Sequence, residues 1–264
     1  MAKDKITKME LLNFQKETSE QGNLRLVADN KEPQLFPQIE KQFVSFIFFR
    51  VNPDWRKLDG ETKEAFKKEF QSIYDQFAEK LLLFSYSLVG FDSKADLMFW
   101  RIGTSLDLIQ DMTAKLYRTN LGSFLETTDN HLSMTKKMMF IPPDVQEGVE
   151  NRYYVKAGEK KYHFVYPCAK SHHWYEKPGE ERDALVEENF MVGRKFKNIK
   201  IHLTHAFGFS EKEYIISFET DEPKDFLALA EELRETPASK FNLRGMPVYT
   251  CRLRNLAECL DAIG

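Results

Sequence analysis

Cysteine is scarce in this chain of 264 residues, which has three cysteines at positions 168, 251 and 259. So few and scattered cysteines exclude a disulfide framework and a zinc site built from paired thiolates. Long apolar runs are absent too, and none approaches the roughly 18 residues that a membrane-spanning helix needs. The N-terminal stretch MAKDKITKMELLNFQKE has no uninterrupted apolar segment, so a signal peptide is not expected.

An excess of positive charge is also missing, because 38 basic residues face 41 acidic ones and the net charge is −3. This balance excludes the basic surface of a typical nucleic-acid binder. No phosphate-binding loop, paired zinc motif or Ser-His-Asp constellation is apparent. We therefore expect a cytoplasmic protein with no nucleic-acid partner and no membrane span.

What the chain does have is apolar material, with 42% hydrophobic and 13% aromatic residues. This is enough for one large domain or two small ones. Residues 1–40 are polar and end in KEPQLFPQIEK, which predicts an N-terminal arm.

After residue 40 the same order of elements is predicted twice. The first half has a strand at 43–51, a helix at 61–80, a hairpin around Asp92 and Ser93, a helix that starts near Ser105, and an extended segment at 131–141. After a polar bridge at 142–161, the second half has a strand at 162–170, a helix at 179–196, a hairpin within 198–221, a helix at 222–241 and a strand at 246–255.

The repetition is also visible in the residues themselves. VGFDSKADLMFWRIGTSLDL aligns without gaps on FGFSEKEYIISFETDEPKDF, so that Gly90 matches Gly208 and Lys94 matches Lys212. This predicts an α+β fold of two β-α-β-β-α-β halves, residues 41–150 and 151–264. Since the strands are apolar on both faces, the two sheets should join face to face as a barrel with room for a ligand between them.

The predicted helix that contains ALVEENFMVGRKF carries one unexpected residue. Ala184, Leu185, Val192 and Phe196 share an apolar stripe at helical spacing, and Asn189 lies on the same stripe. A buried amide without partners costs roughly 1–3 kcal/mol. Asn189 therefore has neighbours as partners, contacts a ligand, or stands where a different residue once functioned.

The six histidines give no clear metal site. The pair His172 and His173 lies in a polar segment that is typical of a solvated loop. In IKIHLTHAF, strand alternation places His202 on one face and His205 on the other. For each of them a hydrogen-bonded structural role is the simplest interpretation.

The segment VYPCAKSHHWYEKPGEER has Tyr166, Lys170 and Trp174 at intervals of four residues. A cation pairs with a carboxylate, an indole gives apolar contact, and a phenol donates a proton or is oxidised. Together they suit a flat aromatic ligand with carboxylates. The alternative is a core tyrosine, a surface lysine and a core tryptophan.

This segment resembles the chlorite dismutase superfamily, which includes the coproheme decarboxylases. The family pattern YPxxKxxxWYxxPxxER, followed by a helix and GR, matches YPCAKSHHWYEKPGEER and GR here. LVGFDSKADLMFW and YRTNLGSFLE resemble segments of the family's first half, and the match spans about residues 43–255. The resemblance implies two ferredoxin-like halves in a dimeric-type α+β barrel and a homo-oligomer, usually a pentamer.

The resemblance also implies roles for individual residues. Tyr166 matches the tyrosine that decarboxylases oxidise beside a haem propionate, and Lys170 matches the lysine that contacts a propionate. Trp174 matches the tryptophan near the haem-binding helix. The implied cofactor is haem or coproheme, and the implied activity is peroxide-dependent coproheme decarboxylation in haem biosynthesis.

Two positions depart from the family pattern. The proximal histidine that ligates iron is replaced by Asn189, and the carboxylate that supports it in chlorite-degrading members is replaced by Ala238. An amide is a poor iron ligand beside imidazole. The paired loss indicates that the iron-ligand role itself is gone.

The distal arginine of chlorite dismutases is absent as well. Counting forward from Asn189 reaches His202, whereas counting back from Gly208 reaches Ile201, so chlorite decomposition is not expected. If His202 faces the pocket, it is the candidate axial ligand and acid–base residue. Three hypotheses remain: a haem-dependent oxidoreductase, a member that lost catalytic haem and acts in binding or assembly, and a structural paralogue with a filled pocket.

Overall fold

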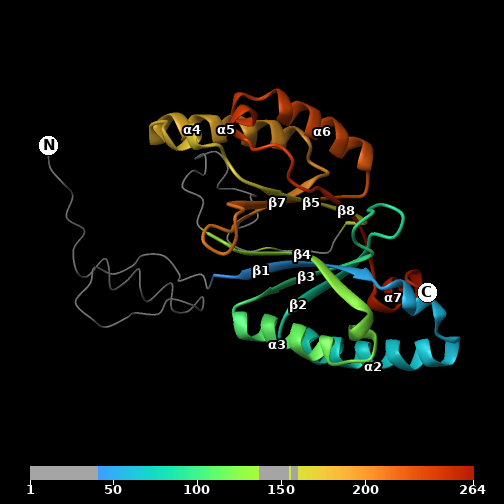
Figure 1. Cartoon of the computed structure of the whole chain (residues 1–264). Coiled ribbons are helices and arrows are strands. Elements are labelled where there is room, and N and C mark those ends of the chain that lie inside the picture. Colours follow the sequence, from blue (N-terminus) through green and yellow to red (C-terminus); the bar gives the residue numbers. More distant parts are fainter. Residues whose placement is uncertain (1–40, 137–154, 156–159) are drawn as a thin grey trace, which may run out of the picture. The chain divides into compact units, whose positions relative to one another are not determined.

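Eight antiparallel strands close into a barrel in the order β1-β3-β2-β8-β5-β7-β6-β4 (Figure 1). The computed structural model describes residues 41–136, 155 and 160–264. The predicted arm at 1–40, the end of the extended segment at 137–141 and the predicted boundary at residue 150 lie outside the described residues. Within the described residues no helix is long and apolar enough to cross a bilayer.

The predicted order of elements occurs twice, which confirms an α+β fold of two ferredoxin-like halves. The first half consists of β1 (Phe43–Val51), α2 (Gly60–Ala78), β2 (Leu82–Ser87), β3 (Leu97–Gly103), α3 (Leu106–Tyr117) and β4 (Leu125–Met134). The second consists of β5 (Tyr162–Cys168), α5 (Gly179–Lys195), β6 (Lys200–His205), β7 (Tyr214–Thr220), α6 (Pro223–Glu235) and β8 (Tyr249–Arg254).

Short helices lie between or after these elements. They are η1 (Pro53–Lys57), η2 (Leu121–Phe124), α4 (His172–Tyr175), η4 (Pro237–Phe241) and α7 (Leu256–Ala262). The sequence interpretation did not anticipate α7, although Asn255 and Glu258 form a capping box at its start. Strand pairs β2–β8 and β4–β6 join the halves, and β4–β6 is reduced to the single pair Met134–His205.

The two hairpins turn in the same way, as the repeat predicts. Gly90 and Gly208 both have a φ of 80°, a left-handed conformation that strains other residues. In each turn the N–H after the glycine donates to the carbonyl three residues back, at 2.8 Å in the first turn and 2.9 Å in the second.

The second turn is one residue shorter than the first. The N–H of Leu88 donates to the carbonyl of Asp96, whereas the N–H of Ala206 donates to the carbonyl of Glu213. The gapless alignment therefore holds up to the turn and shifts by one residue after it. A shift of one residue reverses which face of the sheet a side chain occupies.

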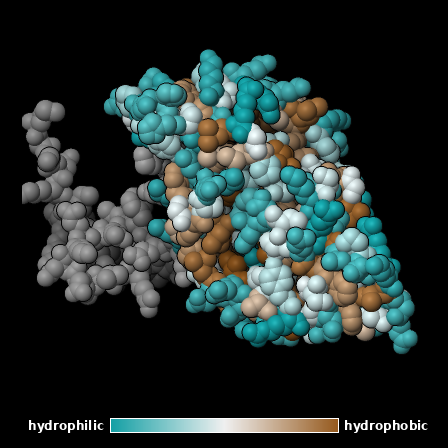
Figure 2. All heavy atoms as spheres, viewed as in Figure 1, coloured by the Kyte–Doolittle hydropathy of each residue, from teal (hydrophilic) through white to brown (hydrophobic). Residues whose placement is uncertain are grey.

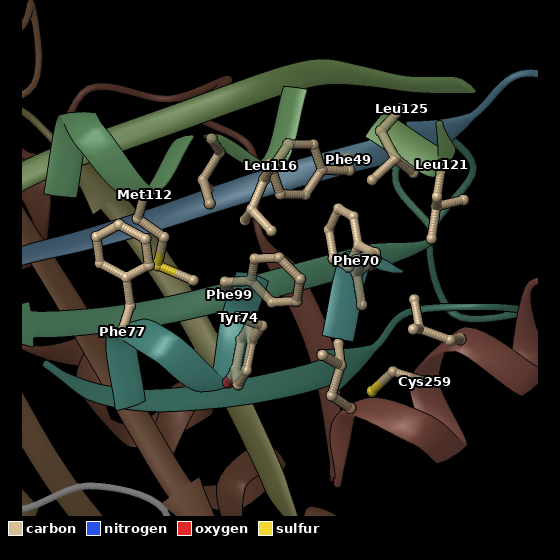
Figure 3. Close-up of a cluster of buried hydrophobic side chains, with 14 of the residues drawn as sticks. Phe49, Phe70, Tyr74, Phe77, Phe99, Met112, Leu116, Leu121, Leu125 and Cys259 are labelled. Carbon is tan, nitrogen blue, oxygen red and sulfur yellow. The ribbon is translucent and has the colours of Figure 1, made fainter. Parts of the chain in front are cut away.

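Helices cover the outer faces of the barrel on opposite sides, with α2, α3 and α7 over the first half and α5 and α6 over the second (Figure 1). Under the first group lies a dense apolar core in which β1, β3 and the helices meet (Figure 3). Its aromatic members are Phe49, Trp55, Phe70, Tyr74, Phe77 and Phe99. The exposed sides of these helices carry mostly hydrophilic residues in the view of Figure 2.

The interior of the barrel is packed with side chains, which corrects the expectation of a ligand space between the sheets. Phe46 stacks on Trp100 with ring centroids 5.2 Å apart, and Phe48 stacks on Tyr249 at 3.8 Å. These residues belong to a buried cluster that draws on both sheets. A space for a ligand must therefore be sought on an outer face.

Replacement of either turn glycine by alanine should lower the free energy of unfolding by about 1–2 kcal/mol, because alanine resists the left-handed conformation. Gly60→Ala is the matched control, since Gly60 has open space around its Cβ position and no positive φ. Urea denaturation of Gly90→Ala, Gly208→Ala and Gly60→Ala measures the difference. Equal stability of all three variants would contradict the assigned turn strain.

Candidate functional site

Helix α5 packs on its sheet more loosely than the other long helices do. None of its residues, all of which the structure describes, is fully buried, whereas α2, α3 and α6 each contain buried residues. Its closest backbone neighbours are α6 and η4, whereas α2, α3 and α6 each approach a strand closely. The face of the second sheet beneath α5 is therefore the candidate pocket.

One end of α5 does contact the sheet. A methyl group added at Gly193 would lie 2.9 Å from Cδ1 of Ile201 on β6. Val192 and Phe196 join the same apolar cluster on this face of the sheet. The looser part of the helix is consequently the part before Gly193.

Asn189 lies on this side of α5, as the stripe predicts. It is half-buried, and its Oδ1 atom is buried without a hydrogen-bond partner among the described residues. Leu185, Val192 and Phe196 on the same stripe are half-buried as well, but Ala184 is exposed, which corrects its predicted place there. Because buried polar atoms almost always have partners, the Asn189 oxygen marks a place where a ligand atom would be stabilised.

Tyr166 lies on the outer face of β5, the same face that α5 and α6 cover. Its ring makes edge contacts with Phe218 at 5.7 Å and with Phe226 of α6 at 5.8 Å. Burial raises the pKa of the phenol, and the nearby positive charge of Arg234 acts in the opposite direction. The phenol therefore stays protonated at neutral pH.

Lys170 follows β5 and is held by two neutral groups. Its ammonium donates to the backbone carbonyl of Ala238 at 3.3 Å and lies 4.5 Å from the ring centroid of Trp174. Burial lowers the pKa of Lys170, while Cys168 and Glu213 oppose the shift. Trp174 is buried and also packs on Phe241, so it supports the lysine rather than offering a free face to a ligand.

Two further cations flank this face, and sequence reasoning did not single them out. Burial and the carboxylate of Glu213 raise the pKa of Tyr175 and of Tyr214, and the charge of Arg182, near the start of α5, opposes these shifts. The Nε atom of Arg182 is buried without a partner among the described residues. Arg234, near the end of α6, acts on Tyr166. Arg182 is the arginine of the PxxER motif, which was the signal in the sequence that could have identified it.

His202 does not join these residues. It lies on the inner face of β6, where its Nε2 atom is 2.9 Å from a carboxylate oxygen of the fully buried Glu219. Its ring makes an edge contact with Trp100 at 5.2 Å. Because alternate residues of a strand face opposite sides, His202 is separated from Tyr166 and Asn189 by the sheet itself. The expectation of His202 as axial ligand or acid–base residue does not fit this geometry.

His163 lies beside this pair in the barrel interior. Both of its ring nitrogens lack a hydrogen-bond partner among the described residues, as do the hydroxyl of Tyr86 and Nε1 of Trp100. Burial, and then the charge of His202, hold the pKa of His163 well below its usual value, so the ring is neutral. The interior is therefore a mainly aromatic core with a few buried polar groups, and it lies on the other side of the sheet from the candidate pocket.

The other histidines of the second half do not gather at the pocket. His172 and His173 are exposed on α4, and His173 pairs with Glu176 at 2.9 Å. His205 lies on the outer face of β6 but at the end of the strand, against Tyr214 and Phe207. No group of three or more potential metal-ligating side chains occurs among the residues that the structure describes.

The fold and the pocket define a class: a barrel of two ferredoxin-like halves with a candidate ligand site beneath a helix of the second half. The family model for chlorite dismutase matches residues 63–254. The chain therefore belongs to the chlorite dismutase family.

Named relatives represent two activities. The chain is 24% identical over 208 residues to the chlorite dismutase of Ideonella dechloratans, covering 76% of this chain and 72% of the relative. It is 28% identical over 196 residues to a coproheme decarboxylase of Oceanobacillus iheyensis, covering 68% and 78%. A solved chlorite dismutase variant from Candidatus Nitrospira defluvii has a TM-score of 0.75 at 27% identity, covering 83% of this chain and 94% of the other.

The residues at the pocket fit one part of a haem group and not the other. Lys170, Arg182 and the apolar strand face suit a flat ring that carries carboxylates. Helix α5 would offer an iron ion no imidazole ligand, because Asn189 carries a neutral amide instead. The donor set therefore does not fit an iron ion ligated from this helix.

His202→Ala should lower the free energy of unfolding by about 1–3 kcal/mol, because Glu219 loses a hydrogen bond in a buried place. Thermal and urea unfolding of the purified variant measure this effect. His173→Ala is the control, since its pair with Glu176 is exposed and surface pairs contribute little. A His202→Ala variant as stable as the control would contradict a structural role for this histidine.

Proposed function

We propose that this protein binds a carboxylated tetrapyrrole, haem or coproheme, between α5 and the outer face of the second sheet. The observation that carries the proposal is a covered but loosely filled face: α5 has no fully buried residue, and the Asn189 oxygen beneath it is buried without a partner among the described residues. A planar apolar ring is the kind of ligand that such a layer between helix and sheet accommodates.

The charges around this face support a ligand with carboxylates. Lys170 is oriented by the Ala238 carbonyl and the Trp174 ring, both of which are neutral. Glu213, whose carboxylate accepts the backbone N–H of Lys170 at 2.8 Å, is the nearby negative charge with which an incoming anion would share the ammonium. Arg182 and Arg234 add positive charge at two other points of the same face. Lys170 and Arg182 are half-buried whereas Arg234 is exposed, and partly buried cations form stronger pairs with carboxylates than exposed ones do.

The second candidate function is peroxide-dependent decarboxylation of coproheme in haem biosynthesis. Tyr166 favours it, because a half-buried phenol that remains protonated retains the O–H bond that oxidation would break. Similarity to coproheme decarboxylases is consistent with this activity. Against it stands Asn189, since peroxide activation in the family depends on an imidazole ligand.

A protein that binds or assembles without catalysis is the alternative to an oxidoreductase. Asn189 and Ala238 both favour it, because the positions of the iron ligand and of its supporting carboxylate have lost the required chemistry together. Homo-oligomerisation, as a pentamer by family resemblance, stays a prediction. Chlorite decomposition is not proposed, since neither His202 nor Ile201, the two residues that counting places at the distal position, is an arginine.

Lys170→Met should weaken binding of coproheme or haem about tenfold, or about 1.4 kcal/mol, because the ligand carboxylate loses a charged partner. Absorbance titration with each porphyrin measures the dissociation constant. Lys57→Met is the control, as Lys57 is an exposed lysine of the first half. If wild type shows no binding of either porphyrin at saturating concentration, the proposed function is wrong.

Tyr166→Phe separates the two candidate functions. If the protein decarboxylates coproheme, the wild type should convert it with peroxide and the variant should lose at least about tenfold in rate, because phenylalanine has no O–H to oxidise. Mass spectrometry of the porphyrin follows the loss of carboxylate groups. Binding without conversion by the wild type would leave the non-catalytic function, and unchanged turnover of the variant would exclude Tyr166 as the redox residue.

A further inference from the structure

The helix wall of the pocket has no strong iron ligand. Asn189 faces the sheet and offers an amide, whereas Met191, whose thioether could ligate iron, is 50% exposed on the outer side of α5. The rest of α5 contains no histidine or cysteine. A neutral amide oxygen binds ferric or ferrous haem much more weakly than imidazole does.

The strand wall has no strong iron ligand opposite α5 either. Ile201 and Ile216 belong to the apolar cluster on this face, and Leu203 is the registered partner of Ile216. These three aliphatic side chains come from neighbouring strands. The histidine between Ile201 and Leu203 in sequence, His202, lies on the opposite face of the sheet against Glu219.

Among the described residues near this face, the remaining candidate ligands are poorly placed or held in a form that binds iron weakly. Tyr166 and Cys168 would have to ligate as anions, but burial raises the pKa of the phenol and raises the pKa of the thiol to about 12. His205 packs against Tyr214 and Phe207 at the end of β6, two residues beyond Leu203 along the strand.

We propose that this pocket recognises the tetrapyrrole ring and its carboxylates without selecting for iron, so that it takes metal-free porphyrins as readily as haem or coproheme. The inference rests on the proposed function and specifies its ligand class. Aliphatic side chains contribute through burial of the ring, and Lys170 contributes through the carboxylates. Both contributions are the same whether or not a metal occupies the centre of the ring.

Two matched pairs of probes test this inference on the wild-type protein. Haem is compared with protoporphyrin IX, and coproheme is compared with coproporphyrin III, because the members of each pair carry the same carboxylates. Competition for a single fluorescent porphyrin gives all affinities by one readout. Within each pair the dissociation constants should agree within about threefold.

An introduced histidine provides the second arm. Asn189→His should tighten binding of the iron porphyrins about tenfold or more and shift the Soret band, while leaving the metal-free porphyrins within about threefold of wild type. Met191→His is the matched control, because it adds the same imidazole on the exposed side of the helix. It should change neither affinity nor spectrum. Circular dichroism establishes that both variants are folded.

Each outcome decides the inference. If wild type binds haem and coproheme more than about threefold tighter than their metal-free partners, iron is being ligated and the inference is wrong while the proposed function stands. Loss of that preference in His205→Ala, Tyr166→Phe or Cys168→Ala would then identify the ligand. If no porphyrin of either kind binds, both the inference and the proposed function fall.

Discussion

Burial on both faces of most strands, with β4 as the exception, is the constraint on which the rest of this structure depends. One face of each sheet closes the barrel interior, and the other lies under helices. Because side chains alternate along a strand, each one lies either in the barrel interior, the inner compartment, or under the helices, the outer compartment. The chemistry of the second half follows from this division, since Tyr166 belongs to the outer compartment whereas His163 and His202 belong to the inner one.

The inner compartment differs from an ordinary apolar core. It contains a buried His202–Glu219 pair, a Ser133–Thr204 hydrogen bond and the neutral ring of His163, all enclosed by aromatic side chains. Buried polar groups favour one arrangement of the strands over its alternatives, because a change of register would leave them without partners. The polarity of the interior thus serves the pairing of the two halves, which elsewhere depends on short strand contacts.

Much of the fold could be predicted from the sequence, because apolar periodicity and an internal repeat are local signals. The glycine turns, the helix containing Asn189 and the alternation around His202 all follow from such signals. The position of His202 relative to the candidate pocket did not, since strand alternation separates the two faces of β6 without showing which of them lies under α5. Arg234 was missed because its approach to Tyr166 is created by the packing of α6 and has no pattern in the sequence.

The absence of a side chain at Gly193 has a consequence for how far a ligand can enter. Since the helix backbone there lies against Ile201, no layer of atoms can be inserted between α5 and β6 at that point. The contact therefore bounds the candidate pocket on the C-terminal side of α5. Under the proposed function, a ring that enters beneath α5 would be limited by this contact, which lies one helical turn after Asn189.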